Sequence, residues 1–341
     1  FPYTTLFRSA DEIIVVDTGS TDATPEIAAA YTDRVYSFAW VDDFAAARNE
    51  AFSKATCDYC LWLDADDVLL PEDREKLLWL KAELDPAVDM VMMKYHVAFD
   101  AQGQPTFTYE RERLIRNGAG YRWVGAVHEV IPPQGRVLHA DIAVCHRKLH
   151  AADPDRNLRI FEKLLAQGKT LDPRQQYYYA RELYYHGRYE AAARRLTAFL
   201  DAGEGWVENN IGACRDLAHC YEALGHPMRA MQALLRSLTY DAPRAEVCCD
   251  LGRLLMAQHH DAMAVFWYEL ALKRPVDSST GGFHEPDCHG YIPCMQLCVL
   301  YDRLGDRRKA EAYNERAAAL KPDDAGVAYN RAYFARKKAG A

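Results

Sequence analysis

The sequence predicts a doubly wound α/β domain followed by an all-α domain of helical repeats. Up to about residue 150, short apolar and β-branched runs alternate with helix-like segments, a pattern typical of α/β domains. Beyond that point the strand signals fade, and helical patterns recur at intervals close to those of helix-pair repeats. We therefore expect an α/β domain over residues 10–150 and a repeat domain over residues 151–341.

Composition limits the class of protein. The 341 residues are enough for two domains, and 50% apolar with 26% charged residues suits a soluble globular protein. The net charge of -8 argues against a nucleic-acid partner, and no apolar run is long enough to predict a membrane span. The 10 cysteines are scattered along a long chain, which predicts reduced thiols and a cytoplasmic location.

The first nine residues, Phe1–Ser9, match nothing that follows in the chain. They look like translated adapter sequence joined to a gene fragment, so we expect them to be non-native and leave them out of the fold prediction. The strand that would precede Asp11 in an α/β domain is then expected to be missing.

The α/β pattern begins with a β-branched run at Glu12–Val16, which predicts a buried strand. The polar turn Asp17–Asp22 follows it, and a helix is expected from there, with Pro25 near its first turn. A second short strand is expected at Val35–Phe38 and a second helix at Ala45–Lys54.

The segment Asp58–Leu70 is predicted to be the next strand, and it carries carboxylates at Asp64, Asp66 and Asp67. Carboxylates beside a buried strand need partners, because unpaired buried charge is very costly. A divalent cation shared with the phosphates of a ligand would supply one. The alternative is a solvated acidic turn before a helix.

The rest of the α/β pattern consists of one helix and several strands. The helix follows Pro71 and carries an apolar face at Leu77, Leu80 and Leu84. If the strands are parallel, ligands bind at the carboxyl ends of the strands, and Asp17 and Asp64 both lie at such ends. We therefore expect the two residues to belong to one ligand site. The later strands are predicted at Met90–Phe99, Phe107–Tyr109, Leu114–Arg116, Val127–Ile131 and Ile142–Cys145.

Several motifs together resemble the family 2 glycosyltransferases, which have a GT-A fold and invert the anomeric configuration of a nucleotide-sugar. The motifs are VDTGSTD ending at Asp22, ARN at Ala47–Asn49, WLDADD at Trp62–Asp67, RLIRN at Arg113–Asn117 and GAVHE at Gly125–Glu129. The chain is similar to the branch with C-terminal tetratricopeptide repeats, which includes peptide S-glycosyltransferases.

The resemblance implies roles for residues at matching positions. Asp17, with Ser20 in the same turn, would bind the base of the donor, which is typically uracil, and Arg48 would lie near the diphosphate. Asp64 would meet the ribose or metal region. Asp66 would ligate Mn²⁺ or Mg²⁺. Glu129 would be the catalytic base with His128 beside it, and His146 would complete the metal site, although Arg147-Lys148-Leu149 replaces the usual Tyr-Gly-Tyr.

Each of these residues also has a plainer interpretation. Asp17 and Ser20 could simply make a turn. Arg48 could be a solvated helix charge. Glu129 could be a surface strand residue paired with Arg122 or Arg116, and His146 an ordinary polar residue.

The C-terminal half resembles a row of tetratricopeptide units. Gly187 and Gly225 are 38 residues apart, Gly225 and His259 are 34 apart, and His259 and Gly305 are 46 apart. We expect these four residues at equivalent turns, with an insert at Val276–Tyr291 in the last interval. Four units exceed the roughly three needed for a stable stack. The repeats are expected to bind a peptide, position the catalytic domain, or pair two chains as a homodimer.

The insert contains His284, Cys288 and His289, with Cys294 beyond it. Their spacing matches no common zinc pattern, so a loop that shapes the repeat groove is the preferred interpretation.

The predicted function is a metal-dependent inverting glycosyltransferase that moves a sugar, from a UDP-sugar by expectation, to a peptide or protein acceptor. The alternative is a repeat-based interaction scaffold with a truncated or inactive transferase domain. A nucleotidyltransferase is a weaker option, because the usual Gly-rich, Lys-containing start is not visible.

Overall fold

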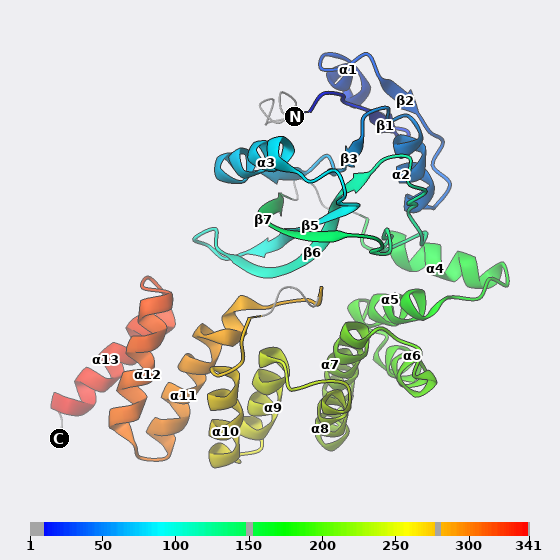
Figure 1. Cartoon of the computed structure of the whole chain (residues 1–341). Helices are drawn as coiled ribbons and strands as arrows, with labels where there is room; N and C mark the ends of the chain where they lie inside the picture. The colour runs from blue at the N-terminus through cyan, green and yellow to red at the C-terminus, as the bar shows by residue number, and fades with distance from the viewer. Residues whose placement is uncertain (1–9, 148–152, 277–280, 340–341) are drawn as a thin grey trace. The chain divides into compact units, whose positions relative to one another are not determined.

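The structure, a computed structural model, describes residues 10–147, 153–276 and 281–339. The chain divides into two compact units, Phe1–Glu182 and Leu183–Ala341, and each is described here by itself (Figure 1). The predicted non-native segment Phe1–Ser9 and the predicted boundary at residues 150–151 lie outside the described residues.

The first unit contains two β-sheets. A small sheet pairs β1 with β2 in parallel, and a five-stranded sheet has the order β3-β6-β5-β7-β4. In the larger sheet only β5 and β7 are parallel, and the other neighbours are antiparallel. The strands and helices are β1 (Val15–Asp17), α1 (Thr24–Ala29), β2 (Val35–Ser37), α2 (Phe44–Ser53), β3 (Tyr59–Leu61), β4 (Asp67–Leu69), α3 (Pro71–Glu83), β5 (Met90–Phe99), β6 (Pro105–Arg116), β7 (Val137–His146) and α4 (Arg156–Ala166).

The prediction of parallel strand order was therefore wrong for most of this unit. The connection between β5 and β6 is a short turn in which the Asp100 side chain accepts hydrogen bonds from the backbone N–H groups of Gln102 and Gln104. A connection this short admits only antiparallel neighbours, because parallel pairs need a long crossover. β3 then pairs with β6, with Cys60 opposite Ile115, and not with β1 or β2.

The predicted strand Asp58–Leu70 is two strands in the structure. β3 ends at Leu61 and β4 begins at Asp67, on the opposite edge of the same sheet. A turn joins them, in which Asp67 N–H donates to the Asp64 carbonyl at 3.0 Å and Asp64 N–H donates to Asp67 Oδ2 at 3.1 Å. The acidic cluster breaks the strand because its own backbone and side chains satisfy one another there.

Two other strand predictions also changed. The predicted strands at 107–109 and 114–116 belong to one long strand, β6. Val127–Ile131 is not a strand, and this region has only an isolated bridge between Val124 and Val130. Gly125 with φ of 94° and His128 with φ of 53° interrupt the extended backbone there.

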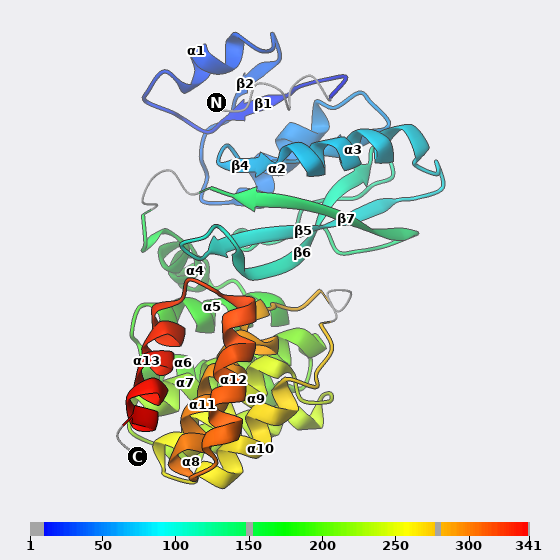
Figure 2. The ribbon, with the colours of Figure 1, turned by 90° about the vertical axis from the view of Figure 1, so that its left-hand side faces the viewer.

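The five-stranded sheet is covered on both faces, as the alternation of side chains along β5 shows. Val91 and Met93 pack on one face with Leu77 and Leu80 of α3, which lies along the sheet in Figure 2. Met90 and Met92 point to the other face, where they pack with Ala45 of α2, Trp62 and Trp123. The period of two along the strand thus places Trp62 and α2 on the same side of the sheet.

The second unit is a row of antiparallel helix pairs. Neighbouring helices in the chain pack on one another in order, from α6 on α7 through to α12 on α13. The helices are α5 (Pro173–Tyr185), which spans the division between the units, α6 (Tyr189–Ala202), α7 (Val207–Ala223), α8 (Pro227–Arg236), α9 (Ala245–Ala257), α10 (Asp261–Ala271), α11 (Tyr291–Arg303), α12 (Arg307–Leu320) and α13 (Ala325–Ala339), with 3₁₀ turns η2 (Ser237–Thr239) and η4 (Pro286–His289).

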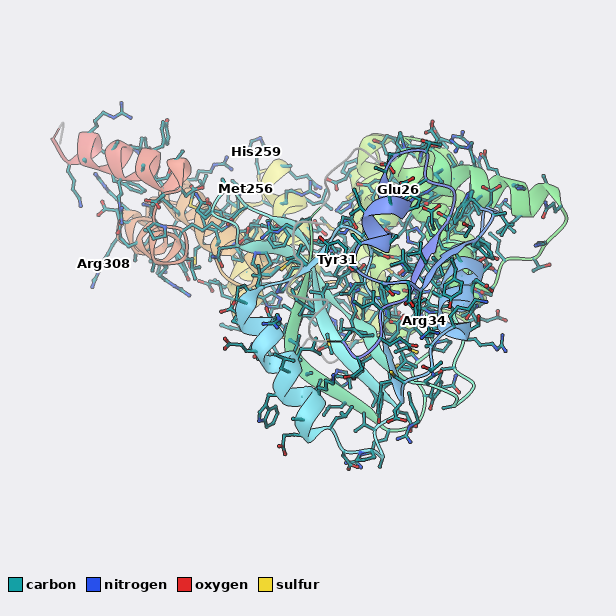
Figure 3. All side chains as sticks on the ribbon, turned by 90° about the horizontal axis from the view of Figure 1, so that it is seen from above. Glu26, Tyr31, Arg34, Met256, His259 and Arg308 are labelled. Carbon is teal, nitrogen blue, oxygen red and sulfur yellow. The ribbon has the colours of Figure 1, made fainter. Side chains whose placement is uncertain are left out.

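The turns within the helix pairs confirm the predicted repeat. Gly187, Gly225, His259 and Gly305 all have positive φ, at 69°, 76°, 60° and 83°. In each turn this residue donates its N–H to a carbonyl three residues earlier, as His259 does to Met256, and both residues are labelled in Figure 3. This is the left-handed helix end that glycine adopts at least cost.

None of the helices in the described part of the chain is both long and apolar enough to span a membrane.

Candidate functional site

Three side chains converge where β4 and β7 meet at the edge of the five-stranded sheet. The register of these strands places Asp67 opposite His146. His146 Nδ1 lies 3.4 Å from Asp66 Oδ1 and 3.4 Å from Asp67 Oδ1, and one ligand atom from each residue lies within 4.8 Å of the others. His146 Nδ1 is buried and makes no hydrogen bond of normal geometry. Two carboxylates and a free ring nitrogen form a donor set that suits a divalent cation.

Asp67 is the buried anchor of this cluster. Its Oδ2 accepts a hydrogen bond from Arg113 Nη1 at 2.8 Å, and its Oδ1 accepts one from the Tyr95 hydroxyl at 2.8 Å. Burial opposes ionisation of Asp67, but its contacts with His146, Arg113 and Tyr95 lower its pKa to about 2. Its contact with Asp67 raises the pKa of His146, again against burial. Asp67 is therefore a fixed negative charge that leaves Asp66 as the more accessible carboxylate.

Arg48 joins two of the predicted site residues. It lies on α2, and its Nη2 donates to Asp64 Oδ1 at 2.7 Å while its Nε donates to Glu129 Oε1 at 2.6 Å. Its guanidinium lies 4.5 Å from the ring centre of Trp62 and 4.9 Å from that of Trp123. Burial lowers the pKa of Arg48, but the charges of Asp64 and Glu129 outweigh burial and raise it. These contacts contradict the plainer alternatives, in which Arg48 is a solvated helix charge and Glu129 pairs with Arg122 or Arg116.

Glu129 is buried, and two arginines contact it, one at its side chain and one at its backbone carbonyl. Arg48 binds its side chain, and Arg111 Nη2 donates to its carbonyl at 2.9 Å. His128 points elsewhere, with its Nε2 2.8 Å from Glu182 Oε1 and its ring stacked on Tyr178 at 4.2 Å. The structure therefore does not pair His128 with Glu129 as neighbouring catalytic groups.

Asp17 and Ser20 form the turn after β1. The Asp17 carboxylate accepts hydrogen bonds from Gly19 N–H at 3.1 Å and from Ser20 N–H at 3.1 Å. The Ser20 side chain is the main cause of a lowered pKa for Asp17. Gly19 has φ of 109°, which glycine tolerates in such a turn. This geometry fits the turn interpretation, and the role in base binding stays a prediction.

The motif ARN also contains a residue with a structural role that was not predicted, Asn49. Asn49 donates from its side chain to the Trp123 carbonyl at 3.0 Å and accepts from Trp123 N–H at 3.0 Å. Trp123 then packs edge-on against Trp62 at 5.0 Å. Asn49 thus holds the aromatic surface on which Arg48 lies.

Three residues of the site were given no specific role from the sequence: Asp67, which is the buried anchor, and the arginines Arg111 and Arg113. Arg113 is fully buried and lies 3.8 Å from the ring centre of Trp62. A usable signal was present in β6, where charged residues occupy consecutive positions 110–113 within a strand. Charges in the middle of a strand covered on both faces must be paired, so they indicate partners elsewhere in the fold.

Comparison with known proteins places this site in a family. Residues 4–143 match the model of Glycosyl transferase family 2. The lipopolysaccharide core biosynthesis glycosyltransferase LpsC of Rhizobium meliloti is 32% identical over 136 residues, which cover 38% of this chain and 50% of LpsC. The SPbeta prophage-derived glycosyltransferase SunS of Bacillus subtilis is 24% identical over 227 residues, which cover 63% of this chain and 51% of SunS.

A TPR repeat-containing protein of Synechococcus elongatus is 38% identical over 122 residues, which cover 36% of this chain and 29% of that protein. The chain thus spans between 29% and 51% of the length of these curated relatives. Among solved structures, similar helices occur in PilF of Pseudomonas aeruginosa, with a TM-score of 0.42, 19% identity, and coverage of 53% of this chain and 75% of that one. A TPR protein of Thermus thermophilus has a TM-score of 0.38 and 19% identity, with coverage of 53% and 89%.

These TM-scores are low, and the repeat character of this chain rests on its own helix pairs and turns. The family match includes Arg48 and Asp66. The match to SunS spans 227 residues and is therefore longer than the family match. The N-terminal part of this chain is a glycosyl transferase family 2 domain, and a helical region of tetratricopeptide type follows it.

Proposed function

We propose that this chain transfers a sugar from a nucleotide-sugar, by preference a UDP-sugar, to a peptide or protein acceptor with inversion at the anomeric carbon. The observation that carries the proposal is the cluster of Asp66, Asp67 and His146, of which the two aspartates lie within the family 2 match and His146 lies just after it. A divalent cation, Mn²⁺ or Mg²⁺, would be held there by Asp66 and His146. Bound to the donor, it would stabilise the negative charge of the leaving nucleoside diphosphate.

The residues present fit such a cation. His146 offers a buried Nδ1 that has no hydrogen bond, and Asp66 offers a carboxylate oxygen 3.4 Å from it. Asp67 is already engaged by Arg113 and Tyr95, so it would fix the site without being its main ligand. Two protein ligands leave room for phosphate oxygens and water, which is the usual way that Mg²⁺ is bound.

Glu129 is the proposed general base, and Arg48 is the proposed contact of the diphosphate. A diphosphate that competes for Arg48 would release the Glu129 carboxylate from that contact. The acceptor's hydroxyl or thiol would then lose its proton to that carboxylate as it attacks the sugar. Asp17 and Ser20 would contact the base of the donor.

The helical pairs of the second unit are the proposed acceptor-binding part, and a homodimer formed through them is the alternative use. All 10 cysteines are free thiols and nine of them are buried, which supports the proposed cytoplasmic location.

The test is hydrolysis of UDP-sugars and GDP-sugars, followed by release of the nucleotide, with Mn²⁺, with Mg²⁺ and with a chelator. We expect turnover of one nucleotide-sugar that needs the cation and is lost in Asp66→Ala. A suitable control is Asp141→Ala, which removes an exposed carboxylate of β7 that pairs with Lys76 and Lys94. NMR of the product's anomeric proton would test inversion.

Absence of both turnover and nucleotide binding in the wild type would contradict the proposal. It would favour the alternative that was predicted beside it, a repeat-based scaffold with an inactive transferase domain.

A further inference from the structure

The insert between α10 and α11 is fastened to α9 in the second unit. Glu285 N–H donates to Glu246 Oε1 at 2.9 Å, and the Cys249 thiol donates to the Cys288 carbonyl at 3.6 Å. The 3₁₀ turn η4 packs against both α9 and α11. The insert therefore has a fixed place on the helix pair in the part that the structure describes, which begins again at residue 281.

Two histidines of the insert converge on one carboxylate of α9. Glu246, His284 and His289 each place one ligand atom within 4.8 Å of the other two. Glu246 is 3% exposed and His284 is 7% exposed, so these groups lie inside the unit. The three residues are separated by 38 and 5 positions in the sequence, so only the fold brings them together.

The two Nε2 atoms of this cluster lack hydrogen-bond partners among the described residues. Both His284 Nε2 and His289 Nε2 are buried without one. His289 Nδ1 lies 3.3 Å from the Arg274 carbonyl, which can only accept, so Nδ1 carries a proton and Nε2 is the ring nitrogen left to bind a cation. It faces Glu246 Oε1 at 3.8 Å. A proton on Nε2 pairs these two atoms when no metal is bound, and a metal cation can take the place of that proton.

The arginines near this cluster are bound to other carboxylates. Arg215 donates to Asp250 and Glu285, both at 2.8 Å. Arg244 pairs with Glu208 and Asp241. Within the described residues, Glu246 has no hydrogen bond from an arginine, and its carboxylate accepts the Glu285 N–H and faces His289.

We propose that Glu246, His284 and His289 form a zinc site that fastens the insert to α9. Two imidazoles and a carboxylate are a ligand set that Zn²⁺ takes in proteins, with a fourth position left for water or for an atom of a bound molecule. The contact of His289 Nδ1 with the Arg274 carbonyl is the outer hydrogen bond that orients such a ligand. Binding needs no redox or group-transfer step.

The ligands of this site differ from the group of His284, Cys288, His289 and Cys294 that the sequence analysis considered and set aside. Cys288 and Cys294, which stand beside the two histidines in the sequence, are buried in two separate apolar clusters. The third ligand, Glu246, comes from a helix more than 30 residues earlier in the chain. The spacing of cysteines and histidines could not reveal it.

The test is the zinc content and zinc affinity of the full chain after dialysis against a chelating resin. We expect the wild type to bind one Zn²⁺ at the insert in competition with a chromophoric chelator. His284→Gln should weaken that binding about 100-fold or more, because it removes a ligand. Asp66→Asn should leave it unchanged, which separates this site from the cluster in the first unit. His219→Gln is the matched control, because His219 also contacts a carboxylate of α9, Asp250.

A second measurement does not depend on whether His284→Gln folds. Co²⁺ added to the Asp66→Asn chain should give visible absorption bands of the intensity typical of four or five ligands. Zinc binding that His284→Gln leaves intact in a folded variant would overturn the proposal. Absence of both zinc binding and the Co²⁺ bands in the Asp66→Asn chain would overturn it as well.

Discussion

Different kinds of contact stabilise the interior of each of the two units. In the first unit, buried charges meet across long stretches of sequence, such as Arg113 with Asp67 and Arg48 with Glu129. In the second unit, the same local turn recurs along the chain with positive φ at one residue. A contact between distant residues fails as a whole when one partner is lost, whereas a repeated turn fails one unit at a time. This difference predicts large effects of single changes in the first unit and small ones in the second.

The second unit also contains contacts between distant charged residues, such as Arg215 with Asp250. The cluster of Glu246 with His284 and His289 joins distant residues where an insert interrupts the repeat. In a row of similar units, an insert of this kind indicates a role beyond helix packing, which here is the proposed zinc site.

The largest expected effect is on turnover, in Glu129→Gln. The variant keeps the shape of the side chain and an acceptor for Arg48, but it cannot take a proton. We expect turnover to fall about 10²- to 10⁴-fold, with nucleotide-sugar binding retained. The measurement is nucleotide release at saturating donor, beside donor affinity from a thermal-shift titration. Glu110→Gln is the control, because Glu110 is also a buried carboxylate and pairs with His139. Turnover above a tenth of the wild-type value would remove Glu129 from the proposed mechanism.

The next effect is on stability, in Arg113→Met. Arg113 and the Asp67 side chain are fully buried, and the change would leave that carboxylate without its charged partner. We expect a loss of about 3–5 kcal/mol in the free energy of unfolding, measured by urea denaturation. Lys94→Met is the comparison, because it breaks an exposed pair with Asp141 and should cost about 1 kcal/mol or less. Equal losses in the two variants would contradict the expected difference between buried and exposed ion pairs in this unit.

The repeated turns should respond in opposite directions at two equivalent positions. Gly225→Ala places a Cβ at φ of 76° and should cost about 1 kcal/mol. His259→Gly relieves the same conformation at φ of 60° and should gain up to about 1 kcal/mol. Thermal and urea unfolding followed by circular dichroism would measure both. A loss of stability in His259→Gly would mean that its side chain contributes more than its backbone costs.

The smallest effect is a pH dependence in the second unit. Burial opposes protonation of His219, but its hydrogen bond with Asp250 raises its pKa. A raised folded-state pKa stabilises the fold fully below the unfolded pKa of about 6.5, and that stability is lost as pH rises through the folded-state value. We expect the wild type to lose about 0.5–1 kcal/mol between about pH 6 and pH 9 relative to His219→Gln. Parallel pH dependences in the two proteins would exclude this pair as the cause.

The sequence predicted those parts of the fold that depend on local pattern. β5 was predicted at its observed bounds, Met90–Phe99, and α2 within one residue at each end. The turn at His259 was placed correctly although the residue is not glycine, because the repeat interval identified it. Periodicity and turn spacing are properties of neighbouring residues, so they are visible in one sequence.

The pairing between strands could not be predicted from local sequence pattern. The carboxylates of Asp64 and Asp67 divided one predicted strand into two, and the register of β4 with β7 then brought Asp67 to His146. The motifs identified Asp66 and His146 as candidates, but the buried partners Arg113 and Tyr95 come from strands whose order the sequence does not encode locally. Tertiary pairing of charges therefore had to be read from the structure.

The most direct test of the central claim is Mn²⁺ binding measured by electron paramagnetic resonance, with UDP present, in the wild type, His146→Gln and His139→Gln. Both histidines lie on β7 and both contact a buried carboxylate, but only His146 belongs to the Asp66 cluster. The account predicts that His146→Gln weakens Mn²⁺ binding about 10- to 100-fold and that His139→Gln leaves it unchanged. Equal Mn²⁺ affinity in all three proteins, or none in the wild type, would contradict it.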